Sequence, residues 1–109
     1  MSASAPHIPY AQFQAMLRAG NHAFIRRNAE RITMGLPDAA EVCRLIAEQD
    51  PASLEPASVH WIRRFAAEAQ AQERRDYGLI VQAFDAMTAQ PELAASQLAA
   101  LCAARGLDR

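Results

Sequence analysis

Apolar side chains recur every three or four positions along most of this chain, the spacing that places them on one face of an α-helix. The clearest case is residues 57–89, where two apolar series flank the polar run 72–76. The series are Trp61, Ile62, Phe65, Ala66 and Ala69, then Leu79, Ile80, Ala83, Phe84 and Met87. The pattern predicts helix on both sides of the polar run.

Two interpretations of residues 57–89 are open. One long helix could run through, with Gly78 costing about 1 kcal/mol relative to alanine. Alternatively, the chain turns near Asp76-Tyr77-Gly78 and the two halves pack as an antiparallel hairpin. A single helix of this length needs a core about 45 Å long to pack against. A chain of 109 residues hardly supplies such a core, so we favour the turn.

Residues 1–8 are small or include proline, and we expect a flexible lead followed by a single helical domain over 9–109. The first helix should begin near Pro9 and stop at Gly35, which can take the left-handed conformation that ends helices. Gly20 would then lie within this helix, where a glycine indicates close approach of another helix.

Later helix boundaries are marked by acidic residues, prolines and glycine. Asp38 can cap a second helix that ends before Pro51. A last helix should run from Pro91 to Arg105 and stop at Gly106, with Leu93 among its inward residues. No stretch alternates apolar and polar residues as a strand would.

The expected fold class is therefore all-α, a compact bundle of four or five helices or a set of stacked helical hairpins. The predicted core is Phe13, Leu17, Phe24, Leu45, Ile46, Ile62, Phe65, Ile80, Phe84, Leu98 and Leu101.

Composition narrows the class of protein. Half of the residues are apolar and the net charge is −1, so the chain is typical of neither disordered nor membrane proteins. All 11 basic residues are arginine, a bias typical of a bacterial, GC-rich genome or of sites that bind phosphate or carboxylate. Residues 1–37 hold four Arg and one Glu, a net +3, whereas residues 38–50 hold four acids and one Arg, a net −3.

Location is indicated by the cysteines and the N-terminus. Cys43 and Cys102 lie at apolar helical positions, which favours buried free thiols and a reducing compartment. The first residues lack the basic and apolar segments of a secretory signal, and no uninterrupted apolar run is long enough to span a membrane. We expect a cytoplasmic protein with no membrane partner.

The residue types that commonly catalyse reactions or bind metals do not have the sequence spacing of a catalytic or metal site. His7, His22 and His60 lack the spacing of a metal site, and neither cysteine has a histidine near it in sequence. No nucleophile elbow or phosphate loop is present. We therefore expect no catalytic, metal or cofactor-binding residues and no enzymatic activity.

Two partial resemblances suggest binding functions. Arg75-Asp76-Tyr77, followed by Ala83, Phe84 and Pro91, is similar to the second half of a tetratricopeptide repeat, which implies stacked hairpins with a peptide-binding face. The prolines at 51 and 91 are, however, further apart than that family's repeat of about 34 residues.

Residues 41–46 and 58–65 together resemble the two helices of a helix-turn-helix motif. This resemblance implies a DNA-binding regulator with Ser58, His60, Arg63 and Arg64 facing the groove. The segment between them is longer than the motif's turn of about three or four residues and contains two prolines. Nucleic acid is therefore the alternative partner.

The favoured function is a non-catalytic protein–protein interaction module: a small adaptor, a chaperone or an accessory subunit. The partner would be another protein with an acidic surface, and homo-oligomers are left open. The predicted contact residues are Arg26, Arg27, Trp61, Arg63 and Arg64, with Trp61 acting as an anchor if it is exposed.

Overall fold

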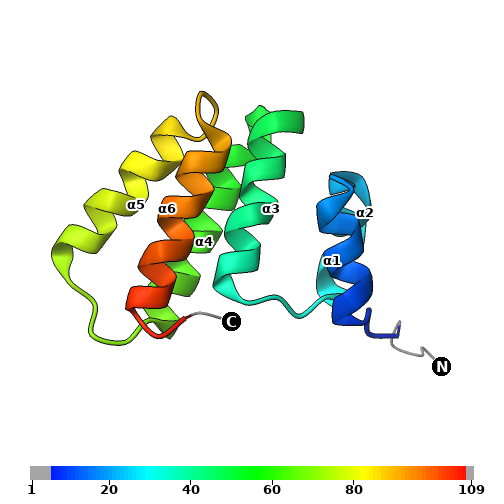
Figure 1. The fold of residues 1–109 in the computed structure, drawn as a ribbon, viewed down its shortest axis with the longest axis horizontal. Coiled ribbons are helices and arrows are strands. Elements are labelled where there is room, and N and C mark those ends of the chain that lie inside the picture. Colours follow the sequence, from blue (N-terminus) through cyan, green and yellow to red (C-terminus); the bar gives the residue numbers. More distant parts are fainter. Residues whose placement is uncertain (1–5, 108–109) are drawn as a thin grey trace. The chain divides into compact units, whose positions relative to one another are not determined.

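A computed structural model describes residues 6–107, and within them the chain is all-α with no strand. The chain divides into two compact units, residues 1–34 and residues 35–109. The first contains α1 (Tyr10–Arg18), α2 (His22–Arg27) and the 3-10 helix η1 (Ala29–Arg31). The second contains α3 (Leu36–Gln49), the 3-10 helix η2 (Pro51–Ser53), α4 (Leu54–Glu68), α5 (Arg74–Ala86) and α6 (Pro91–Ala104) (Figure 1).

The all-α prediction is confirmed, but residues 6–107 hold six α-helices instead of four or five. The prediction of one helix from Pro9 to Gly35 is wrong. Gly20 has φ +69° and ends α1, because glycine takes this left-handed conformation without steric cost. The Asn21 side chain then accepts a hydrogen bond from the Phe24 N–H at 3.1 Å and starts α2.

The segment before α1 is bound to the end of the first unit. The Ile8 N–H donates to the Arg31 carbonyl at 2.8 Å, and Arg31 Nε donates to the Pro6 carbonyl at 2.9 Å. Ile8 is also buried. Of the predicted flexible lead 1–8, residues 1–5 lie outside the described residues, and residues 6–8 are held by these contacts.

Gly35 does not stop a helix, contrary to the prediction. It has an extended conformation, φ −70° and ψ 168°, and directly precedes α3. Pro37 lies in the first turn of α3, where its missing N–H costs no hydrogen bond, so proline favours a helix start here. Asp38 therefore lies inside the first turn instead of capping it, and α3 ends at Gln49, before Pro51 as predicted.

Residues 57–89 form two helices, as favoured, but the break is earlier than expected. The chain leaves α4 at Ala69, and Ala71 has φ +50°. Glu73 then starts α5 through a capping box, in which Asp76 Oδ2 accepts the Glu73 N–H at 2.9 Å. Asp76 and Gly78 consequently lie within α5.

The predicted last helix and its stop are confirmed in α6. Gly106 has φ +78°, and the Leu107 N–H donates to the Cys102 carbonyl at 2.7 Å. The Gly106 N–H donates to Ala103, which completes the glycine-dependent stop known as the Schellman motif.

The four long helices of the second unit enclose one core. Along the chain α3, α4, α5 and α6 each pack on the next, and α6 returns to pack on α3 (Figure 1). The largest core side chains are Trp61, Phe65, Ile80, Phe84 and Leu98. Of the predicted core, Phe24, Ile62 and Leu101 are only half-buried, and Leu93, predicted to face inward, is 52% exposed.

Alanine substitutions at two glycines of this unit should change the free energy of unfolding in opposite directions. At Gly78, inside α5, an added Cβ would meet no atom within 4 Å, so Gly78→Ala should raise the free energy of unfolding by about 1 kcal/mol. At Gly106 the positive φ strains any side chain, and Gly106→Ala should lower it by about 1 kcal/mol. Urea denaturation of both variants checks this, and shifts of the same sign would contradict it.

Candidate functional site: a groove between α5 and α6

Trp61, the predicted anchor, lies in the core and not at the surface. Its side chain is 1% exposed, and its ring stacks on Phe65 with centroids 5.8 Å apart. The Phe84 ring also packs against the indole, with centroids 5.8 Å apart and the ring planes 69° from parallel. The indole Nε1–H donates to the Leu36 carbonyl at 3.0 Å and so ties α4 to the start of α3. Trp61 was predicted to contact a partner only if it is exposed, and it is buried.

The predicted arginine contacts are distributed over both units. Arg26 and Arg27 are exposed on α2 in the first unit, and Arg63 is exposed on α4 in the second. Arg64 is partly buried and donates through Nε and Nη2 to both oxygens of Glu68, at 2.8 and 3.2 Å. This ion pair reduces the charge that Arg64 can offer a partner.

The thiols of the two cysteines have low reactivity. Burial raises the pKa of Cys43 to about 12. Burial and, to a smaller extent, the charge of Glu68 raise the pKa of Cys102 to about 11. Both thiols therefore stay protonated at neutral pH, and a protonated thiol is a poor nucleophile and metal ligand. The described residues contain no cluster of three or more histidine, cysteine or acidic side chains that could hold a metal ion.

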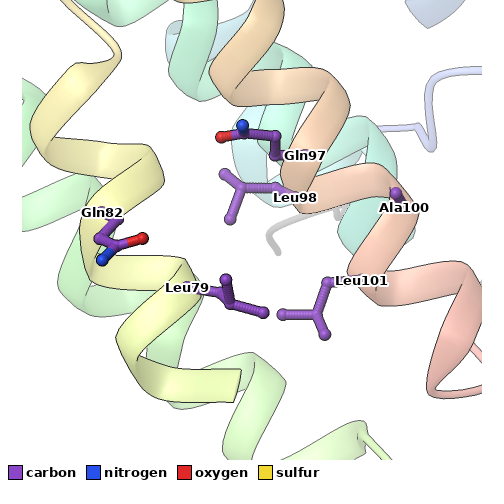
Figure 2. A pocket seen from close by; sticks show the side chains of 6 residues that line it. All are labelled: Leu79, Gln82, Gln97, Leu98, Ala100 and Leu101. Atoms are coloured by element: carbon purple, nitrogen blue, oxygen red, sulfur yellow. The ribbon is translucent and has the colours of Figure 1, made fainter. Parts of the chain in front are cut away.

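A groove opens between α5 and α6 where sequence reasoning placed no site. We call it the α5–α6 groove, and its volume is about 360 Å³. The residues that line it are Leu79, Gln82, Gln97, Leu98, Ala100 and Leu101. Leu79 of α5 and Leu101 of α6 point toward one another across it (Figure 2). Leu79 is 54% exposed, whereas Leu98 at the base is buried. The groove therefore presents apolar surface to solvent.

The rim of the groove is polar but uncharged. Gln82 on α5 and Gln97 on α6 are both exposed and can donate and accept hydrogen bonds (Figure 2). An apolar floor with a few polar groups at its edge is the usual composition of a binding surface.

A charged pocket of about 530 Å³ continues the groove toward the start of α5. It shares Leu79, Gln82 and Leu101 with the groove and adds Arg75, Asp76, Gly78 and Arg105. Arg105 donates to both oxygens of Asp76, at 2.8 and 2.9 Å, and these bonds, together with the Glu73 N–H, lower the pKa of the Asp76 carboxyl. Arg75 pairs with Glu73 at 2.6 Å but is 77% exposed.

The opposite ends of α5 and α6 carry exposed acidic residues that line neither pocket. Asp85, near the end of α5, and Glu92, in the first turn of α6, are both exposed. The positive end holds Arg74, Arg75 and Arg105 against Glu73 and Asp76, a net +1. The groove thus has an apolar centre and an arginine end.

Searches among protein-family models, curated proteins and solved structures find no match to this chain. No helix in residues 6–107 is long and apolar enough to cross a membrane.

One signal in the sequence could have located the groove. From Leu93 to Ala104 the chain has no charged residue, so α6 lacks the polar face of an ordinary surface helix. A helix that is apolar on all sides must expose some of its apolar surface. The prediction that Leu93 faces inward did not allow for this.

Proposed function

We propose that this protein is a non-catalytic interaction module that binds a helix of another protein subunit in the α5–α6 groove. The observation that carries the proposal is the exposed Leu79, which faces Leu101 across an open apolar pocket. An apolar floor between two parallel ridges is the form of site that accepts the apolar face of an amphipathic helix.

The charges at the groove indicate the chemistry of the bound helix. One apolar side chain would fill the pocket, and an acidic residue would lie near the arginine end at Arg75 and Arg105. This agrees with an acidic partner surface, although the arginines concerned differ from Arg26, Arg27 and Arg63. Those three remain predicted contact residues.

Site-specific photo-crosslinking tests the proposal. A photoreactive amino acid replacing Gln97 should give a light-dependent protein adduct in the native cell. The same amino acid at His60, exposed on α4, should give much less. The adduct is identified by mass spectrometry, and its binding is reproduced with purified components. Leu79→Glu should reduce it at least tenfold, since a buried charge opposes docking. Equal crosslinking from both positions, or none from Gln97, would refute the groove as a binding site.

DNA binding, the alternative, has less support. Of the four residues predicted to face the DNA, Arg64 is paired with Glu68, and the chain has a net charge of −1. A titration with mixed duplex DNA at low salt, where phosphate contacts are strongest, separates the two functions.

A further inference from the structure

Gly78 is an exposed glycine inside α5 whose missing side chain is not explained by packing. An added Cβ would contact no neighbouring element within 4 Å among residues 6–107, so alanine would fit here. Glycine is nevertheless less favourable than alanine inside a helix. Gly78 also lines the charged pocket that continues the α5–α6 groove. A glycine in such a place lets a bound molecule approach the helix backbone closely.

Gly78 belongs to one continuous face of α5. The spacing i, i+3, i+4 and i+7 is shared by four residues that all line the charged pocket: Arg75, Gly78, Leu79 and Gln82. Leu79 and Gln82 line the groove as well (Figure 2). Arg75 comes four residues before Leu79, a separation of about 6 Å along the helix. A helix lying along this face therefore meets a cation, an open space and an apolar side chain in succession.

The two arginines of the charged pocket differ in how far their charge is already used. Arg105 is mostly buried and donates to both oxygens of Asp76, so its guanidinium is held within the fold. The Arg75 side chain is mostly exposed and pairs through Nε with Glu73, which is itself half-exposed. An exposed ion pair of this kind contributes little to stability, so another carboxylate can replace Glu73 at small cost. Arg75 is therefore the cation that a partner can reach.

We infer that the helix bound in the α5–α6 groove carries an aspartate or glutamate that pairs with Arg75, and that its backbone passes directly over Gly78. The acid comes three or four residues from the apolar side chain that fills the pocket, because one helical turn of about 5.4 Å matches the separation of Arg75 and Leu79. Charge complementarity supports an acid at this end, since arginine binds a carboxylate through two parallel hydrogen bonds. The inference rests on the proposed function and names the partner's chemistry and the two residues that select it.

Substitutions at Gly78 separate binding from folding. Gly78→Ala should stabilise the fold yet weaken binding of the purified crosslinked partner by about threefold, because the added methyl stands where the partner's backbone passes. Gly78→Gln, with a longer side chain in the same space, should weaken binding by roughly tenfold. Val81→Gln is the matched control, since Val81 is exposed on α5 but lines neither pocket. Isothermal titration calorimetry measures the affinities, and circular dichroism confirms that each variant is folded. Wild-type affinity in both Gly78 variants would overturn the inference.

The adjacent arginines test the charge. Arg75→Gln should weaken binding by roughly tenfold, because it removes a charge-assisted contact with the partner. Arg74→Gln removes the same charge from the same turn of α5, but Arg74 lines neither pocket, so the affinity should change by less than about twofold. Equal losses from the two variants would contradict a specific pair.

The partner's acid is located by mapping the crosslinked segment. Replacing it with its amide should weaken binding to the wild-type chain and have little further effect on binding to Arg75→Gln. Fully additive losses would overturn the pairing with Arg75. So would a segment with no acid three or four residues from its apolar anchor.

The inference and the proposed function fail in different ways. If Leu79→Glu abolishes the Gln97 adduct while the Gly78 and Arg75 variants bind normally, the groove is the binding site and the inference is wrong. If no protein crosslinks from Gln97, both are wrong.

Discussion

Replacing Trp61 with alanine is expected to lower the free energy of unfolding by about 3–5 kcal/mol. Trp61 is the largest of the fully buried side chains, and it contacts two aromatic rings, Phe65 and Phe84. The substitution removes those contacts, leaves a cavity and deprives the Leu36 carbonyl of the indole N–H. Domains of this size have a total stability of about 5–15 kcal/mol, so the variant should be close to unfolding at room temperature.

Urea denaturation followed by far-ultraviolet circular dichroism measures this loss, because Trp61 is the only tryptophan and its fluorescence is lost with it. Trp61→Phe keeps an aromatic ring and should cost less, about 1–3 kcal/mol. Val81→Ala, at an exposed position, should change stability by less than about 0.5 kcal/mol. A loss below about 1 kcal/mol for Trp61→Ala would argue against burial and favour the predicted role as a surface anchor.

The contrast between Trp61 and Leu79 shows what periodicity can predict. Both belong to apolar series at helical spacing, and the series correctly place α4 and α5. The width of the buried stripe is set by how closely the neighbouring helices approach. The spacing of apolar residues carries no information on that distance. Trp61 and Leu79 hold the same place in their two series, yet Trp61 is buried, whereas Leu79 is exposed beside a pocket between α5 and α6.

Glycine positions were harder to interpret than proline positions. Pro51 and Pro91 bound helices as expected, because a missing N–H and a fixed φ act locally. Gly20 and Gly78 both lie among residues with a helical apolar pattern, yet Gly20 ends a helix and Gly78 lies inside one. The neighbouring caps account for the difference. Asn21 caps a new helix directly after Gly20, whereas the capping box of Glu73 and Asp76 has already started α5 before Gly78.

The candidate site could be only partly predicted. Its arginine end comes from helices distant in sequence, since Arg75 and Arg105 are brought together by the pairing of α5 with α6. The local patterns that located the helices contain no information on which helices pair. The uncharged stretch Leu93–Ala104 was the single local sign of an unusual surface.

Replacing Asp76 with asparagine should lower the melting temperature at pH 7 by roughly 10 °C. The Asp76 side chain is 1% exposed and links the start of α5 to the end of α6 through Arg105, 29 residues away. Asparagine has nearly the same shape but no charge, so it leaves Arg105 without its main counter-ion. Glu68→Gln, which breaks the partly exposed pair with Arg64, should change the melting temperature by only a few degrees.

The pH dependence separates this charge effect from a packing effect. Because the bonds from Arg105 hold the pKa of Asp76 below its ordinary value, the carboxylate is more stable in the folded chain than in the unfolded one. Its contribution is complete above the unfolded pKa of about 3.9 and is lost as the pH falls through the lower, folded pKa. The gap in melting temperature between wild type and Asp76→Asn should therefore stay constant from about pH 7 to about pH 5 and shrink below about pH 4. Thermal melts across this range measure it. A gap of the same size at the lowest pH would mean that the asparagine disturbs packing, and that the ion pair does not fasten α6 to α5 beside the groove.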